Sequence, residues 1–426
     1  MGNDFGLRCL SAAGLFAMFF IAWLLSENKR RVPWRILAWG MVLQFSLGII
    51  VMRTWLGRAF FDGVRAAFDL LTAASDEGAS FVFGNLTKFF LLERVYMPGP
   101  DGALVEQEMF PINAVFAFHV LTVIIFVSGI AAVLQHWGVI QATVRGMAWL
   151  MRRTLKTSGA ETFLTALLVF IGIESVSAVS SYVKNMTRSE LFTVMTAFLS
   201  TVAASVMVAY AGFGAEPGHL MAASVMSAPA AIAIAKLMIP ETKTPETTAG
   251  GHFVMPVDSE NVFDAAARGA SLGLNMALNV GAVLIVFVGL IFLLDQATVA
   301  ATGLSATALM GYLFRPFAFL MGVPLRDIGP LAELLATKTV INEFIAYQNM
   351  QELIAAEVVS KRTITIATYA LCGFANPGSL GILIGGMSAV APERRGEIAR
   401  MSLRALAAGA LAAFSTACIA GILTPE

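Results

Sequence analysis

The chain has 426 residues, of which 58% are hydrophobic and only 13% are charged, whereas soluble domains have about 25% charged residues. The 28 Lys and Arg residues balance the 28 Asp and Glu residues, so the charge gives no support for a nucleic acid partner. This composition excludes a water-soluble globular protein, because too few polar groups are present to cover its surface. It indicates an integral membrane protein surrounded by lipid.

Eight segments along the chain are predicted to be membrane-spanning helices. A spanning helix needs about 20 mostly apolar residues. The segments that meet this requirement are approximately 10–26, 36–53, 113–135, 189–211, 219–238, 271–295, 302–322 and 398–422. We therefore expect an all-α integral membrane protein with about eight spanning helices.

Two further segments, 57–85 and 137–156, are amphipathic rather than uniformly apolar. Helices of this kind lie at the membrane interface with the apolar face toward lipid. Residues 145–156 are rich in Lys and Arg, which favours the cytoplasmic side for this end of the protein. The polar, Pro- and Thr-rich stretch 239–260 is expected to be a cytoplasmic linker.

Two other stretches, 158–186 and 327–357, have a polar centre that does not suit a helix facing lipid. Glu174 lies in the middle of the first and Glu343 in the middle of the second. Each stretch is long enough to enter the membrane, turn and leave on the same side. Irregular backbone is tolerated at that depth where protein or a water-filled cavity satisfies its polar groups. We therefore predict two re-entrant helical hairpins.

The two hairpins are part of a repeated order of elements. The first is followed by a helix interrupted at Ser200–Thr201, and the second by a helix broken at Asn376–Pro377–Gly378. The number of spans between them places the hairpins on opposite sides of the membrane. This order is typical of an inverted repeat whose binding site lies near the midplane and is formed by discontinuous helices.

Glu174 and Glu343 are the strongest candidates for site residues. A charge at the bilayer centre costs at least about 2.5–3.5 kcal/mol, so it usually serves a transport pathway or a partner. The two carboxyl groups would accept hydrogen bonds from a polar substrate, or bind a cation or a proton. The alternative is a structural role, as a protonated acid or in an ion pair with Lys184 or Lys338.

The break in the penultimate span adds the candidates Asn376 and Ser379. An unwound stretch exposes polar groups that can hold a ligand, although Asn376 also suits the cap of the helix that starts at Pro377. Thr201 and Val202 offer a hydroxyl and a carbonyl to a small cation. The alternative is that Thr201 bonds its own backbone, as Thr in a membrane helix often does.

Motifs of common enzyme sites are absent from the sequence. It has no zinc-protease His pair, no phosphate-binding loop and no dinucleotide fingerprint. This counts against an enzyme and against an ATP-driven pump. The three cysteines, Cys9, Cys372 and Cys418, lie in apolar sequence without metal-ligand spacing, so no bound cofactor is expected.

Several long motifs carry a family resemblance. They are TSGAE at 157–161, ASVMSAPAAIAIAKL at 223–237, KTVINEFIAY at 338–347 and CGFANPGSLGILIGGMSAVAPERR at 372–395. With further matches from about residue 33 onward, the chain resembles the concentrative nucleoside transporter family over nearly its whole length. So many matches in the same order make chance implausible.

The resemblance implies a function as well as a fold. It implies secondary active transport of nucleosides into the cell, by symport with sodium or a proton and by an elevator-like movement of the hairpin-bearing domain. It also implies a homotrimer in the cell inner membrane, in contact with membrane lipid. Na⁺ or H⁺ would be the coupling ion rather than a bound cofactor.

The resemblance gives each candidate residue a role. The ribose would be held by polar side chains, namely Glu174, Glu343, Asn376 and Ser379. The base would pack on two apolar side chains, Val206 and Phe374. A sodium ion would bind oxygen atoms of Ile171, Thr201 and Val202.

The same resemblance implies a scaffold part and a mobile transport part. We expect four regions along the chain. They are scaffold helices with the interfacial helix at 1–156, the first hairpin and following transport helices at 157–238, the linker and further scaffold helices at 239–322, and the second hairpin with the remaining transport helices at 323–426.

The first hairpin departs from the family pattern, which reads Asn-Ile-Phe-Val-Gly-Gln-Thr-Glu. Leu168 stands at the position of the Asn that binds sodium, the Gln and Thr that contact the base are absent, and the stretch up to Glu174 is one residue shorter. The alternative function is therefore cation-coupled transport of another polyhydroxylated solute. A third hypothesis is a non-transporting membrane protein, which the retention of both glutamates argues against.

Overall fold

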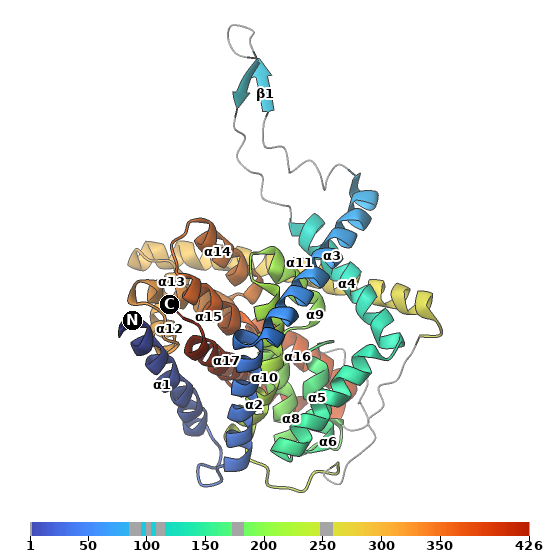
Figure 1. The fold of residues 1–426 in the computed structure, drawn as a ribbon, viewed down its shortest axis with the longest axis vertical. Helices are drawn as coiled ribbons and strands as arrows, with labels where there is room; N and C mark the ends of the chain where they lie inside the picture. Colours follow the sequence, from blue (N-terminus) through green and yellow to red (C-terminus); the bar gives the residue numbers. More distant parts are fainter. Residues whose placement is uncertain are drawn as a thin grey trace.

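The computed structural model describes residues 2–84, 95–98, 104–107, 116–172, 183–247 and 259–425, which are almost entirely helical (Figure 1). The earlier helices are α1 (Gly2–Leu24), α2 (Trp34–Arg53), α3 (Trp55–Phe83), α4 (Phe116–His136), α5 (Val139–Leu155), α6 (Gly159–Leu168), α8 (Arg188–Ser200), α9 (Ala204–Gly212) and α10 (Pro217–Met238). The later helices are α11 (Val262–Thr302), α12 (Ala306–Leu320), α13 (Ile328–Val340), α14 (Glu343–Ala355), α15 (Lys361–Leu371), α16 (Pro377–Val390) and α17 (Arg395–Leu423), with short 3-10 helices η4 (Leu325–Asp327) and η5 (Pro392–Arg394).

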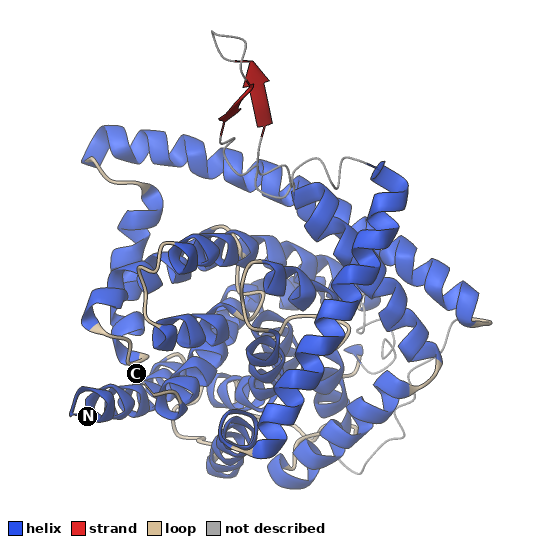
Figure 2. Ribbon diagram, turned by 45° about the horizontal axis from the view of Figure 1, so that its top comes forward, coloured by secondary structure: helices blue, strands red, loops and turns tan. Residues whose placement is uncertain are grey.

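One element was not predicted from the sequence. Two short strands, β1 (Val95–Pro98) and β2 (Leu104–Gln107), lie between α3 and α4 in the chain and pair antiparallel, as Figure 2 shows. Val95 stands opposite Gln107 and Pro98 opposite Leu104. The all-α prediction is otherwise confirmed for the described residues.

The predicted spans are confirmed as helices, with differences in length. Within the described residues, six stretches are long and apolar enough to cross a membrane (α1, α2, α8 with α9, α10, α11 and α17), and the bent pair α4–α5 raises the number to seven. The predicted span 302–322 is α12, an apolar helix of 15 residues. At 1.5 Å per residue it extends about 22 Å, which is short of the hydrocarbon thickness of about 30 Å.

The amphipathic segment 137–156 forms α5, a helix separate from the preceding span. The axes of α4 and α5 meet at 76°, and Gly138 has a φ of 80° at the bend. Glycine adopts this left-handed conformation without the penalty that a Cβ would impose. Such a bend is what an interfacial helix after a span requires.

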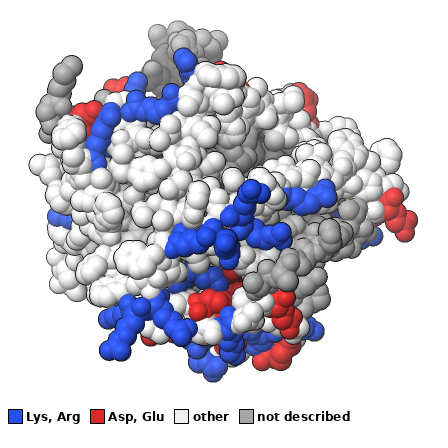
Figure 3. Space-filling view, turned by 60° about the horizontal axis from the view of Figure 1, so that its bottom comes forward, with Lys and Arg blue, Asp and Glu red and all other residues white. Residues whose placement is uncertain are grey.

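The surface of the molecule is largely apolar. Figure 3 shows most Lys, Arg, Asp and Glu side chains of this view gathered on one part of the surface, beside a broad area of uncharged side chains. On α11, the side chains of Ile285, Phe292 and Leu293 are 78%, 61% and 64% exposed. Such a surface is stable in lipid rather than in water, so the chain is a multi-pass membrane protein.

The second predicted hairpin, 327–357, is confirmed as two helices, α13 and α14, with a break at Ile341–Asn342. The side-chain oxygen of Asn342 accepts a hydrogen bond from the backbone nitrogen of Ile345 at 3.0 Å. This cap satisfies one of the free N–H groups at the start of α14. It therefore fixes Glu343 as the first residue of that helix.

The first predicted hairpin, 158–186, is described only in part. Its first arm is α6, which begins with a capping box formed by Ser158 and Glu161. The predicted tip at Glu174 falls within residues 173–182 and lies outside the described residues.

Two broken helices cross at their breaks. The first runs from α8 to α9 through residues 201–203, and the second from α15 to α16 through residues 372–376. Gly373 has a φ of 121°, and a Cβ at this position would lie 2.9 Å from the carbonyl carbon of Ser200. The crossing therefore requires glycine, since a side chain would be strained in φ and would collide with α8.

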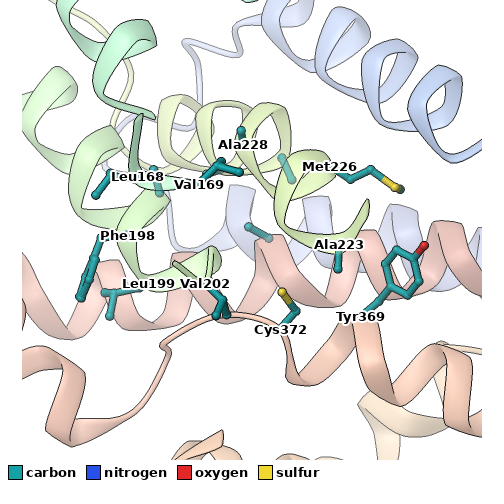
Figure 4. Close-up of a cluster of buried hydrophobic side chains, with 14 of the residues drawn as sticks. Leu168, Val169, Phe198, Leu199, Val202, Ala223, Met226, Ala228, Tyr369 and Cys372 are labelled. Carbon is teal, nitrogen blue, oxygen red and sulfur yellow. The ribbon is translucent and has the colours of Figure 1, made fainter. Parts of the chain in front are cut away.

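A buried apolar cluster surrounds this crossing. Figure 4 shows Phe198, Leu199 and Val202 from the first broken helix in one cluster with Tyr369 and Cys372 from the second. All five are buried. Each broken helix is followed by a long closing helix, α10 or α17, so the order predicted for the repeat is present in the structure.

Small residues mark which helices pack closely together. α11 packs against α4, where a Cβ at Gly269 would lie 2.6 Å from Cβ of Ala132. α1 packs instead against α12 and α17, where a Cβ at Gly14 would lie 2.7 Å from the carbonyl carbon of Leu320 and 3.2 Å from Sγ of Cys418. The amino-terminal helices thus contact the second half of the chain, and α4 pairs with α11.

Candidate functional site

A cavity of about 560 Å³ lies where the second hairpin, both helix breaks and α11 meet. Its size is in the range of small-molecule sites, about 300–1,000 Å³. The second hairpin and the α16 region contribute Asn342, Glu343, Phe344, Phe374, Asn376, Gly378, Ser379, Gly381 and Ile382. The remaining lining residues are Gly172, Phe198, Ala203, Val206, Leu272, Asn275, Met276, Asn279, Val280, Val283 and Leu284.

Glu343 is the only carboxylate among these lining residues, and it is buried. Its Oε1 accepts a hydrogen bond from the Tyr210 hydroxyl at 2.8 Å, and its Oε2 accepts one from Nδ2 of Asn376 at 2.6 Å. Because Glu343 is the first residue of α14, the free N–H groups of that helix favour its negative charge. Each carboxylate oxygen keeps a further lone pair that can accept a hydrogen bond from a ligand.

The ion pair considered for Glu343 is not formed in the described part of the chain. Lys338 is fully buried, but its Nζ donates to the carbonyl oxygen of Ala370 at 2.7 Å. That bond ties α13 to the end of α15. Glu343 therefore faces the cavity with hydroxyl and amide partners rather than a bound ammonium group.

Asn376 has two roles at the start of α16. Its Oδ1 accepts from the backbone nitrogen of Ser379 at 2.9 Å, so it caps the helix, while its Nδ2 holds Glu343. Pro377 is the first residue of α16, where its missing N–H is not needed. The capping role and the contribution to the cavity are thus both present, and the cap orients the amide.

An apolar wall faces these polar groups. Val206 and Phe374, the residues expected beside a base, both line the cavity. The ring of Phe374 lies 5.7 Å from that of Phe198, centroid to centroid. Aromatic and aliphatic surfaces of this kind suit a flat, partly apolar ring, which they can cover without needing a fixed hydrogen-bond pattern.

The three residues expected at a cation site lie near the first break. The Thr201 hydroxyl donates to the carbonyl oxygen of Ala197 at 2.8 Å, and the carbonyl of Val202 accepts from the Ser224 hydroxyl at 3.2 Å. Each oxygen keeps a lone pair that these bonds do not use. Ile171 follows Phe170, whose carbonyl accepts from the backbone nitrogen of Ala204 at 3.3 Å.

Leu168, at the position discussed above, is fully buried. Its aliphatic side chain has no oxygen to offer a cation. Any cation at this place would therefore be held by hydroxyl and carbonyl oxygens of the neighbouring backbone breaks.

The structure brings together most of the residues singled out from the sequence. Glu343, Asn376, Ser379, Val206 and Phe374 line one cavity, although they come from three separate parts of the chain. The outcome for Glu174 is open, because that residue lies outside the described part of the chain.

Sequence reasoning missed Tyr210, Asn275 and Asn279. Tyr210 lies on an apolar helix and reaches Glu343 only because α9 packs on the second hairpin. For Asn275 and Asn279 a signal was present, because they are polar residues four positions apart in a long apolar segment. That spacing places both on one face of a helix.

The comparisons with known proteins cover almost the whole chain. Residues 219–421 match the family "Na+ dependent nucleoside transporter C-terminus", and residues 13–86 match "Na+ dependent nucleoside transporter N-terminus". Residues 117–217 match a family described as "Nucleoside recognition".

Two relatives show the range of lengths in the family. Solute carrier family 28 member 3 of Mus musculus is 39% identical over an alignment of 437 positions, which covers 97% of this chain but 59% of the mouse protein. The uncharacterized transporter YutK of Bacillus subtilis is 39% identical over an alignment of 417 positions, which covers 96% of this chain and 98% of that protein. The chain thus spans well under two thirds of the mouse relative and nearly all of the bacterial one.

Solved structures agree with this match. CNTnw in an inward-facing substrate-bound state has a TM-score of 0.88 at 35% identity, covering 98% of this chain and 99% of that one. A doubly substituted CNTnw in an outward-facing state has a TM-score of 0.87 at 34% identity, covering 98% of both chains. The same fold is therefore known with its site open to either side.

Proposed function

Because the chain belongs to the concentrative nucleoside transporter family, we propose that it carries nucleosides into the cell by symport with a cation. The family is one of transporters and not of enzymes. Family membership favours nucleosides over another polyhydroxylated solute as the substrate.

The observation that carries this proposal is the Glu343–Asn376 pair, which lies in a cavity with an apolar wall opposite its polar groups. A ribose presents two neighbouring hydroxyl groups, each of which donates and accepts a hydrogen bond. The Glu343 carboxylate accepts, the Asn376 amide donates, and the Ser379 hydroxyl does either. Because Glu343 and Asn376 are buried, these bonds would distinguish a diol from an apolar solute.

The coupling ion in this proposal is sodium or a proton. The oxygens near the first break, from Thr201, Val202 and Ile171, would hold a sodium ion. With Leu168 in place of an amide, a sodium site here has one side-chain ligand fewer. Proton coupling would instead use the buried Glu343 or the second glutamate, Glu174.

An elevator movement requires a fixed part and a moving part. The contacts favour α4 and α11 as the fixed part. They favour α1 and α2 as part of the moving body, together with the hairpins. This differs from the expected division, in which residues 1–156 belong to the scaffold. α15 holds α1, because Nη2 of Arg362 donates to the Ser11 hydroxyl at 3.2 Å. α17 holds α2, because the Ser415 hydroxyl lies 3.4 Å from Oε1 of Gln44.

The protein would assemble as a homotrimer in the cell inner membrane. Support comes from the family likeness and from α11, whose most apolar window is only 6% buried in the single chain. Exposed apolar surface of this extent suits contact with lipid and with other copies of the chain.

Uptake into proteoliposomes tests the proposed function. Purified protein would be supplied with labelled uridine or adenosine under a sodium gradient or a proton gradient, each imposed separately. Glu343→Gln is the control variant, and its uptake should fall at least about tenfold, because a charged acceptor contributes more than a neutral one.

Each outcome has a distinct meaning. Uptake driven by the proton gradient alone would exclude sodium as the obligatory ion. Sodium-driven uptake would mean that backbone oxygens hold the cation without the amide at position 168. No uptake of either nucleoside under any gradient, from protein shown to be folded, would refute the proposal.

A further inference from the structure

One wall of the cavity belongs to α11 and carries polar groups that the proposed ribose site does not use. Between Leu272 and Leu294 the polar side chains of this helix are Asn275 and Asn279, and every other residue is apolar or glycine. Both line the cavity, together with Met276 on the same face. A primary amide that faces lipid has no hydrogen-bond partner there, which costs free energy. In a cavity the amide can bond to water or to a ligand.

The two amides have no hydrogen-bond partner within the described part of the chain. The other amides of the lining are engaged, because Asn342 caps α14 and Asn376 both caps α16 and holds Glu343.

α11 runs beside the start of α16, which carries ribose-binding groups, and places the two amides one and two turns away from that contact. Val283 lies one turn beyond Asn279, and its Cγ1 would be 3.6 Å from a Cβ at Gly378. Gly378 is in the first turn of α16, two residues after Asn376. Asn279 therefore faces the region beside the start of α16, and Asn275 lies a further turn, about 6 Å, along the axis.

A second cavity extends from the first along the same helix. It has a volume of about 540 Å³ and is bordered by His136 and Arg268, at the ends of α4 and α11 that lie next to the linker. Leu272 and Asn275 line both cavities. Asn279 borders the first cavity only, so the two amides stand in series from the site toward the second cavity.

We propose that Asn279 and Asn275 recognise the base of the nucleoside, with Asn279 bonding its polar edge in the bound state and Asn275 meeting it on the way to the second cavity. The proposal rests on the proposed function, since it assumes a nucleoside whose ribose is held by Glu343 and Asn376. An amide offers one acceptor and two donors, a combination that matches the edges of both pyrimidines and purines. Recognition of the base would thus come from α11, which belongs to the part that stays fixed. Binding of the ribose would come from residues of the part that moves.

Competition against uptake of labelled uridine tests this assignment. The competitors are uridine, a pyrimidine riboside lacking the oxygen at C4, and a methyl riboside with no base. Asn279→Leu keeps the approximate volume and removes the amide, and Asn279→Gln keeps the amide and shifts it. Gln296→Leu is the matched control, because it removes an exposed amide from the same helix outside both cavities.

The expected result is base-dependent. Asn279→Leu should weaken competition by uridine about five- to tenfold, the loss of one or two hydrogen bonds. It should leave competition by the methyl riboside unchanged. For Gln296→Leu, the inhibition constants of all three competitors should equal those of the wild type. Asn279→Gln should change the ranking of the two pyrimidine ribosides as competitors. Asn275→Leu should slow maximal uptake more than it weakens competition.

Other outcomes overturn the inference without touching the proposed function. If wild-type protein transports uridine and Asn279→Leu retains the same three inhibition constants, the amide does not recognise the base. Equal weakening of all three competitors would assign a general packing role to the side chain. If wild-type protein transports no nucleoside under either gradient, the proposed function itself fails.

Discussion

Asn376 donates a hydrogen bond from Nδ2 to Oε2 of Glu343 at 2.6 Å, and the two side chains are 2% and 3% exposed. The bond joins the start of α16 to the start of α14, so two helix N-termini converge on one carboxylate. N-termini stabilise negative charge. The pair therefore fixes the orientation of the Glu343 carboxyl group, while its remaining lone pairs face the cavity.

Asn376→Asp is expected to abolish most transport while the helix cap survives. Asp caps a helix as well as Asn does, but it cannot donate to Glu343 and would place a second carboxylate beside it. We expect uptake to fall by about tenfold or more. Initial uptake rates together with the thermal unfolding temperature check this prediction. A variant that retains wild-type uptake at pH 7 would show that the amide donor is not needed.

Tyr210→Phe removes the second donor to Glu343 without removing the ring. The ring of Tyr210 stacks on that of Tyr347 with centroids 4.5 Å apart, and Phe preserves this contact. The lost hydroxyl leaves Oε1 of Glu343 without its partner, so nucleoside affinity should fall by a factor of about ten. KM for uridine is the measurement, with Tyr312→Phe, at a half-exposed residue outside the cavity, as the control. Equal KM values in the two variants would contradict the prediction.

Lys236→Met should destabilise the protein strongly. Nζ of Lys236 lies 2.8 Å from Oε2 of Glu161 and 3.1 Å from Oε2 of Glu241, and the Lys236 and Glu161 side chains are 2% and 1% exposed. Removing one partner of a buried pair costs about 3–5 kcal/mol, because the other charge is left unpaired.

The control for this prediction is Arg65→Met, which breaks the 3.2 Å pair with Glu216 in which the Arg65 side chain is 60% exposed. An exposed pair contributes less than about 1 kcal/mol. The unfolding temperature in detergent should therefore fall much more for Lys236→Met than for Arg65→Met. Equal decreases would mean that the buried pair is replaced by other contacts.

Gly373→Ala should disrupt the crossing of the two broken helices. The new methyl group would lie 2.9 Å from the carbonyl carbon of Ser200 at a φ of 121°, so strain and collision add. We expect a loss of about 2 kcal/mol or more in stability and reduced uptake. At Gly289 a Cβ would meet no described atom within 4 Å, so Gly289→Ala should be neutral or slightly stabilising. The measurement is the unfolding temperature of each variant. A Gly373→Ala protein as stable as the wild type would refute the prediction.

The sequence by itself determined the membrane class, the helical segments, the second hairpin and the break at Asn376. These features are local. Hydrophobic length predicts a span, and Asn before Pro-Gly predicts a break followed by a cap, whatever the rest of the chain does. Intramembrane glutamates were also visible as exceptions in apolar sequence, which is how Glu343 was found.

The tertiary structure alone decided which of these exceptions share a site. Tyr210 and Glu343 are far apart in the chain, and no local pattern relates them, because their contact depends on how α9 packs on the second hairpin. The length of α12 and the packing of α1 on α17 and of α2 on α10 were likewise set by long-range contacts. The spacing of four residues between Asn275 and Asn279 indicates from the sequence that both lie on one face of a helix. Only the tertiary structure shows that this face lines the cavity.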